Sequence, residues 1–235
     1  MNKIDITEDK SLLLKNGKIL DITDGKTVSK DILINNGKIV QLGKINDIDN
    51  YHIIDCKNHI ITQSFIDIHT HFQTPGVGDQ ETLVSGSNAA LSGGYSKVCI
   101  MPNTNPVIDK PELIDFILDE ASSLPIDIYP IGAITKKLEG IELAEIGSMV
   151  NSGAVAISDA YSPIMNSQVM RYALEYAKMF DVPVINHPQD MNLVNNGVMN
   201  ESSISNSLGL EGNPRISESI MINRDLEIAN YIKGK

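Results

Sequence analysis

The sequence predicts an α/β protein in which a small β-rich module precedes parallel strands that alternate with helices. Two patterns carry this prediction. The first part of the chain contains short apolar runs joined by Asn-Gly pairs, and the remainder alternates short β-branched runs with segments of helical periodicity. The composition, 42% apolar and 21% charged over 235 residues, suits a globular core. We expect a module over residues 1–60 and a larger domain over residues 61–235.

The module contains two similar segments, residues 12–20 and 32–40, each with an apolar run on both sides of an Asn-Gly pair. Asn-Gly supplies the positive φ angles of a two-residue type I′ turn. The sequence therefore predicts a β-hairpin at Asn16-Gly17 and another at Asn36-Gly37. Neither segment carries residues that indicate chemistry.

Five candidate strands follow the module, each a short apolar run enriched in β-branched residues. They span residues 61–70, 96–102, 127–133, 153–158 and 182–187. Between them we expect a helix from near Glu81 to Gly93-Gly94, and another with Asp109 as N-cap and Pro111 in its first turn. Helical spacing recurs over residues 169–177 and 222–232. The alternation predicts a parallel sheet, either doubly wound or a (β/α)8 barrel.

Charge and composition exclude several partner classes. The 19 basic and 30 acidic residues give a formal net charge of −11, which repels nucleic acid and anionic membranes. No apolar run approaches the ~20 residues that span a bilayer. Residues 1–10 contain no signal region, and the chain has two cysteines, so we expect a cytoplasmic protein.

Histidines and one aspartate end the predicted strands. His69 and His71 close the first strand of the larger domain, and residues two apart on a strand point to the same side. Asp159 ends the fourth strand and His187 ends the fifth. Ligands bind at the carboxyl ends of parallel strands, so the sequence predicts a divalent metal site formed by these four residues.

A metal ion bound by neutral imidazoles suits the hydrolysis of amide-like bonds at neutral pH. Redox chemistry is disfavoured, because neither cysteine stands at these strand ends, and Cys99 lies within the second strand. His52 and His59 belong to the module or its exit and indicate no site.

At these residues the chain resembles the cyclic amidohydrolases and, among them, the dihydroorotases. The most specific segment is 101–109 (MPNTNPVID), which resembles dihydroorotases more than allantoinases. The other matching segments are residues 65–72 (FIDIHTHF), 75–76, 81–86, 93–95, 186–190 (NHPQD), 197–201 and 208–214.

The resemblance implies a zinc-dependent (β/α)8 barrel that interconverts dihydroorotate and N-carbamoyl-aspartate in pyrimidine biosynthesis, with one or two zinc ions. It implies that His69 and His71 bind a first ion, that His187 binds a second, and that Asn103 helps to hold the substrate carboxylate. It also implies that residues 1–60 are half of a small β-sandwich, completed by strands from the far carboxyl terminus.

Two substitutions depart from the pattern of the resembling family. Gln73 stands where an arginine is common. An arginine would bind the substrate carboxylate through two charged hydrogen bonds, whereas glutamine offers one neutral amide. Ala160 stands where the second aspartate of an Asp-Asp-Gly ending bridges two metals, which leaves Asp159 as the nearby carboxylate. Either Asp159 substitutes for it, or the site holds one metal, or it holds none.

The predicted strands account for five of the eight units of a barrel. The resemblance places a later metal-binding histidine and the aspartate that serves as general acid/base beyond Lys235, so we expect the 235-residue chain to be inactive alone. Under this expectation, a partner chain or a second copy of this chain would complete the barrel. The alternatives are a non-catalytic scaffold that partners aspartate carbamoyltransferase, and another cyclic amidohydrolase of hydantoinase or allantoinase type.

Overall fold

The structure is a computed structural model that describes residues 11–46, 51–76, 81–194 and 197–235. The chain divides into two compact units, Met1–Ser64 and Phe65–Lys235, which are described separately. Residues 1–10, where we expect no signal region, lie outside the described residues. No helix in the described part of the chain is both long and apolar enough to cross a bilayer.

The first unit is formed by short strands in two sheets. One sheet has the order β5-β4-β1-β6 and the other the order β3-β2-β7. Leu13, Leu33 and Ile45 form the buried cluster of the unit. The strands are β1 (Leu12–Lys15), β2 (Lys18–Leu20), β3 (Thr27–Ser29), β4 (Asp31–Asn35), β5 (Lys38–Gly43), β6 (His52–Asp55) and β7 (Ile60–Ile61).

One of the two predicted hairpins is confirmed and the other is wrong. Strands β4 and β5 pair antiparallel around Asn36-Gly37, and both turn residues have positive φ. At Asn16-Gly17 only the asparagine has positive φ. Here β1 already pairs with β4 and β6, and β2 pairs with β3 and β7, so the chain changes sheet at this turn. Tertiary pairing on both edges of each strand overrides the local hairpin signal.

Five of the strands described in the second unit pair in parallel in chain order and alternate with helices, as the sequence predicts. They are β8 (Phe65–Thr70), β9 (Tyr95–Ile100), β10 (Asp127–Pro130), β11 (Ile157–Ser158) and β12 (Val184–Ile185). Pairing runs from β8 to β9 to β10 and from β11 to β12, and a parallel bridge between Gly132 and Ile157 joins the two groups. The order shows no reversal, in contrast to a doubly wound sheet.

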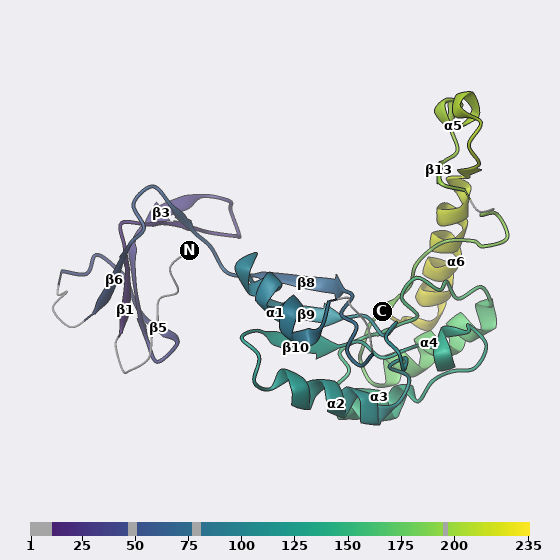
Figure 1. Cartoon of the computed structure of the whole chain (residues 1–235), viewed down its shortest axis with the longest axis horizontal. Coiled ribbons are helices and arrows are strands. Elements are labelled where there is room, and N and C mark those ends of the chain that lie inside the picture. Colours follow the sequence, from purple (N-terminus) through teal and green to yellow (C-terminus); the bar gives the residue numbers. More distant parts are fainter. Residues whose placement is uncertain (1–10, 47–50, 77–80, 195–196) are drawn as a thin grey trace. The chain divides into compact units, whose positions relative to one another are not determined.

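Helices follow the strands in the expected alternation (Figure 1). They are α1 (Leu83–Ser92), α2 (Pro111–Ala121), α3 (Ile146–Ser152), α4 (Ser167–Met179) and α6 (Ile216–Ile232), with a 3-10 turn at Lys136–Leu138. Between β12 and α6 lies a segment with β13 (Met199–Asn200), α5 (Ser203–Leu208) and β14 (Gly212–Asn213). Successive helices α2, α3, α4 and α6 pack on one another.

The bounds of α1 agree with the sequence prediction, and the N-cap of α2 differs from it. Thr82 caps α1 and forms a reciprocal pair of hydrogen bonds with Ser85. Asp109 was expected to cap α2, but Lys110 occupies that position. The Asp109 carboxylate instead accepts a hydrogen bond from the backbone N–H of Lys137 (3.0 Å), and so it fastens the loop after β10.

The strands of the second unit bury both faces in the middle of the sheet. One face packs against the helices in a large cluster that includes Val98, Ile114 and Ile157. The other face forms a smaller cluster of Met101, Ile131, Ala156 and Ala160. Strand β8, at the edge of its sheet, keeps apolar side chains exposed, with Ile68 65% accessible.

Gly86 allows α1 to approach the strand end that carries the histidines. A Cβ at this position would overlap the ring of Phe72, which follows His71 and is buried. The absence of a side chain at Gly86 therefore sets the distance between α1 and the end of β8.

Gly86→Ala should lower the free energy of unfolding by about 1–3 kcal/mol, because the added methyl displaces the Phe72 ring from a packed core. Denaturant unfolding followed by circular dichroism measures the change. The control Ala89→Ser also adds one heavy atom to α1, on an exposed position, and should change stability by less than about 0.5 kcal/mol. Equal effects of the two variants would contradict the packing argument.

Candidate functional site

The carboxyl ends of the five parallel strands gather most of the residues that the sequence singles out. His69 and His71 lie at the end of β8, and Asn103 follows β9. Asp159 directly follows β11, and His187 follows β12 by two residues. Because the strands are parallel and ordered, these positions share one edge of the sheet.

His69 and His71 form a close pair. Their Nε2 atoms lie 3.1 Å apart, and their ring centroids are separated by 5.0 Å. Two nitrogens at this separation, each at a usual Zn–N distance of about 2.05 Å, would subtend an angle of about 100° at one ion, close to tetrahedral. The pair is arranged as two ligands of a single cation.

Asn103 orients the second histidine. The Oδ1 atom of Asn103 lies 2.8 Å from Nδ1 of His71. An amide oxygen only accepts, so Nδ1 carries the proton and Nε2 presents its lone pair toward His69. The amide nitrogen of Asn103 stays available as a donor.

Tyr161 is a central member of the site that the sequence analysis missed. Its ring stacks on His71 with centroids 4.6 Å apart and planes inclined by 18°, and it meets His187 edge-on at 6.0 Å. The His69 ring lies 6.3 Å away. The side chain is 59% exposed, so it lies at the surface of the site. Its place two residues after Asp159, at a strand end, was the available signal.

Asp159 is committed to the backbone of the neighbouring strand end. Its Oδ1 atom accepts hydrogen bonds from the backbone N–H groups of Ile134 (2.8 Å) and Thr135 (2.9 Å), and its Oδ2 accepts one from the Thr135 hydroxyl. Asp159 is 1% exposed, and burial raises the pKa of its carboxyl above the ordinary value, although these hydrogen bonds act in the opposite direction. Thr135 is a second residue that sequence reasoning missed.

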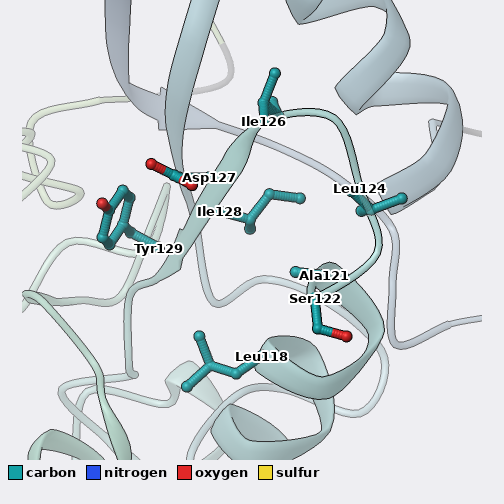
Figure 2. A pocket seen from close by; sticks show the side chains of 8 residues that line it. All are labelled: Leu118, Ala121, Ser122, Leu124, Ile126, Asp127, Ile128 and Tyr129. Carbon is teal, nitrogen blue, oxygen red and sulfur yellow. The ribbon is translucent and has the colours of Figure 1, made fainter. Parts of the chain in front are cut away.

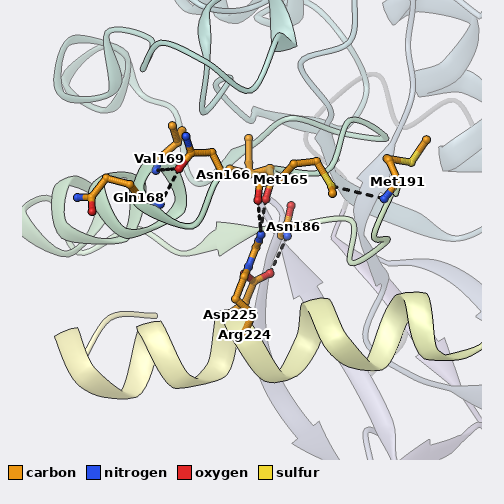
Figure 3. A network of polar contacts seen from close by, with 9 residues as sticks. Met165, Asn166, Gln168, Val169, Asn186, Met191, Arg224 and Asp225 are labelled. Atoms are coloured by element: carbon orange, nitrogen blue, oxygen red, sulfur yellow. Dashed lines mark hydrogen bonds and ion pairs between the residues drawn. The ribbon is translucent and has the colours of Figure 1, made fainter. Parts of the chain in front are cut away.

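Helix α6 anchors the loop before α4 and the residue that follows β12 (Figure 3). Arg224 donates to the carbonyl oxygens of residues 164–165 (2.7 and 2.9 Å) and pairs with Asp225 at 2.6 Å. Asp225 accepts a hydrogen bond from the side-chain nitrogen of Asn186 (2.7 Å), the residue before His187. These bonds connect α6 to the loop before α4 and to the end of β12.

The expected four-residue ligand set is therefore assembled only in part. His69 and His71 come together, whereas Asp159 is turned to Thr135 and His187 lies across the Tyr161 ring. In the parts of the chain that the structure describes, no three His, Cys, Asp or Glu side chains form a group that could hold a metal ion. The physical reason is the competing donors around Asp159 and the aromatic ring beside His187.

Gln73 follows the histidine pair by two residues. It is partly buried, and its backbone N–H donates to the carbonyl oxygen of Glu81 (2.7 Å). This bond closes the loop between β8 and α1. Gln73 therefore lies near the strand end that carries the pair, and its contact with a substrate remains a prediction.

A separate hollow of about 320 Å³ lies at the other end of β10 (Figure 2). It is lined mainly by apolar side chains of residues 118–129, among them Leu118, Leu124 and Ile128, together with Asp127 and Tyr129. It contains none of the residues that the sequence assigns to chemistry, and in parallel α/β folds this end contributes stability.

Burial lowers the pKa of His69 below its ordinary value of 6.5, and the neighbouring His71 acts in the same direction, while Asp67 opposes both. The neutral imidazole, which is the form that binds metals, is thereby favoured at neutral pH. Because the unfolded chain binds this proton more readily, the shift makes the folded state less stable as the pH falls below 6.5.

In the metal-free chain, the His69 imidazole should titrate with a midpoint below 6.5. His71→Ala should raise the midpoint, because one of the causes of the shift is removed. Proton NMR of the imidazole Cε1–H resonance, assigned with His69→Ala, measures both values. A His69 midpoint above 6.5 would contradict the expected direction of the shift.

Comparison with known proteins places these residues in a family. The family model described as dihydro-orotase-like matches residues 58–232. The chain is 41% identical over 224 residues to a dihydroorotase of Ruminiclostridium cellulolyticum, covering 95% of this chain and 52% of the relative. It is 41% identical over 218 residues to a dihydroorotase of Pelotomaculum thermopropionicum, covering 93% and 51%. The chain thus spans about half the length of these relatives.

Solved structures show the same fold at low sequence identity. An L-hydantoinase (dihydropyrimidinase) from Arthrobacter aurescens superimposes with a TM-score of 0.74 at 18% identity, over 96% of this chain and 51% of the other. A dihydropyrimidinase from Brevibacillus agri gives a TM-score of 0.74 at 20% identity, over 96% and 50%. The ordered strand ends, the paired histidines and the match over residues 58–232 lead to one conclusion: the chain belongs to the dihydro-orotase-like family.

Proposed function

We propose that this chain is the amino-terminal part of a zinc-dependent dihydroorotase, a cyclic amidohydrolase that interconverts dihydroorotate and N-carbamoyl-aspartate in pyrimidine biosynthesis in the cytoplasm. In this proposal, residues 65–235 are the first five units of a (β/α)8 barrel. The observation that carries it is the arrangement of His69, His71 and Asn103 at the carboxyl ends of β8 and β9.

The histidine pair supplies two of the nitrogen ligands that a zinc site uses. Two imidazole nitrogens converge, and the second histidine is held in its tautomer by the Asn103 oxygen (2.8 Å), the kind of outer contact that metal-binding histidines require. A zinc ion supplies Lewis-acid activation of an amide carbonyl and of water at neutral pH. His69 and His71 would hold this ion, while Asp159 retains its hydrogen bonds to the loop after β10.

Asn103 can serve the metal site and the substrate at once. Its oxygen is engaged by His71, so its NH2 group is free to donate to a carboxylate oxygen. We assign Gln73 the same kind of neutral contact. Neutral amides bind a carboxylate less strongly than an arginine does, so substrate binding by these residues alone is weak.

The remaining catalytic groups are predicted to lie in the part of the barrel that follows residue 235. They are a further metal-binding histidine and an aspartate that acts as general acid/base. Since the chain spans about half of its relatives, we expect no turnover from residues 1–235 alone, and activity once the barrel is completed.

Two other functions have specific support. Ala160 and the engaged Asp159 fit a non-catalytic scaffold, for example a partner of aspartate carbamoyltransferase. The fold shared with hydantoinases fits another cyclic amide as the alternative substrate class. Segment 101–109 and the sequence identity to dihydroorotases favour dihydroorotate over that class.

The chain should bind zinc through His69 and His71. His69→Ala should abolish binding, and Asn103→Ala should weaken it about 10–100-fold, because an outer-shell partner of a ligand is lost. Asn103→Asp should retain binding, since a carboxylate also accepts from Nδ1–H. Competition with a chromophoric chelator measures the affinities. Equal binding by the wild-type chain and His69→Ala would exclude this site.

Activity is tested with a fusion of this chain to the carboxyl-terminal half of the Ruminiclostridium cellulolyticum dihydroorotase. The fusion should hydrolyse dihydroorotate and lose that activity on His71→Ala, whereas the 235-residue chain should show none. A folded, zinc-loaded fusion that hydrolyses hydantoin but not dihydroorotate would support the second substrate class. A folded fusion that binds no zinc and is inactive would support the scaffold.

A further inference from the structure

We propose that the ring of Tyr161 restricts the histidine site to one metal ion, held by His69 and His71, and keeps His187 out of the ligand shell of that ion. The inference rests on the proposed function, because it assumes that the pair binds zinc. It goes further by setting the number of ions and by giving a role to Tyr161, which the sequence analysis does not single out.

The first argument is the space that the ring occupies. Tyr161 stacks on His71 at 4.6 Å and meets His187 at 6.0 Å with planes inclined by 83°. Both separations are contact distances for aromatic rings. In two-metal sites the ions lie roughly 3.5–4 Å apart. A second ion placed between His71 and His187, together with its own ligands, would need the volume that the phenol ring of Tyr161 fills.

The second argument is that the backbone fixes the point from which the ring projects. The N–H of Ser162 donates to the carbonyl oxygen of Asp159 (2.9 Å) and closes a four-residue turn in which Ala160 has a φ of 51°. The N–H of Ala160 donates to the hydroxyl of Ser158 (3.0 Å). Ala160 itself is 2% exposed and packs in the inner cluster of the sheet, so Tyr161 projects from an anchored turn.

The third argument concerns carboxylates. A second ion beside the first is usually bridged to it by a shared anionic ligand. Asp159, the acidic residue at the end of β11, directs its two oxygens to three donors on residues 134–135. The next residue is the apolar Ala160. This strand end thus presents an aromatic ring, and not a carboxylate, to the histidines.

The experiment is a zinc titration by calorimetry at neutral pH, with stoichiometry checked by metal analysis. The wild-type chain should bind one equivalent. His187→Ala should still bind one, with Kd changed less than about twofold, whereas the loss of a true ligand costs more than about tenfold. Tyr161→Phe is the matched control, because it keeps the ring and removes only the hydroxyl, and it should also bind one equivalent.

The combined variant Ala160→Asp/Tyr161→Gly removes the ring and supplies a carboxylate. It should bind a second, weaker equivalent that disappears when His187→Ala is added. With Mn²⁺ in place of zinc, electron paramagnetic resonance should show spin coupling between two ions in this variant and none in the wild-type chain.

Two equivalents in the wild-type chain, or a Kd raised at least about tenfold by His187→Ala with Tyr161 present, would overturn the inference and leave the proposed zinc site intact. No zinc binding by the wild-type chain would overturn both. If the combined variant does not fold, as judged by circular dichroism, the His187→Ala comparison in the wild-type background decides the question.

Discussion

Parallel pairing of β8 with β9 is the constraint on which the site depends. The backbone N–H of Met101 donates to the carbonyl oxygen of Thr70 (2.9 Å), and the Thr70 hydroxyl donates to the carbonyl of Cys99 (2.8 Å). These bonds set the register in which the histidine pair lies beside Asn103. A slip of one residue would turn the histidines to the other face of the sheet and separate His71 from its orienting amide.

The polar residues at the other strand ends serve mainly to join one strand end to the next. The Asp159 carboxylate holds the loop after β10, and the Arg224–Asp225 pair on α6 holds the loop before α4 and the end of β12. Buried or half-buried charges of this kind are stable only when several donors or acceptors surround them. The turn from which Tyr161 projects directly follows the engaged Asp159, and its own bonds come from the N–H groups of Ala160 and Ser162.

Strand β8, at the edge of the described sheet, exposes apolar side chains, and the chain covers about half the length of its relatives. Ile66 and Ile68 of β8 are more than half accessible, and α6 exposes Ile216 and Leu226 in the same way. In a (β/α)8 barrel the first strand pairs with the last, and neighbouring helices cover the outer faces of the strands. Under the proposed function, these surfaces are where the remaining units would pack.

Local patterns in the sequence determined the strands, most helices and the ligand candidates, because alternation, helical spacing and strand-end histidines are properties of short segments. His69 and His71 could be placed together because they lie two apart on one strand, whereas Asn103 was assigned by the family resemblance, and its contact with His71 comes from the structure. Tertiary structure alone decided the pairing at Asn16-Gly17, the cap of α2, the commitment of Asp159 to Thr135 and the ring of Tyr161 beside two histidines. Each of these depends on which partner a backbone edge or carboxylate finds across the fold, and no local pattern specifies that partner.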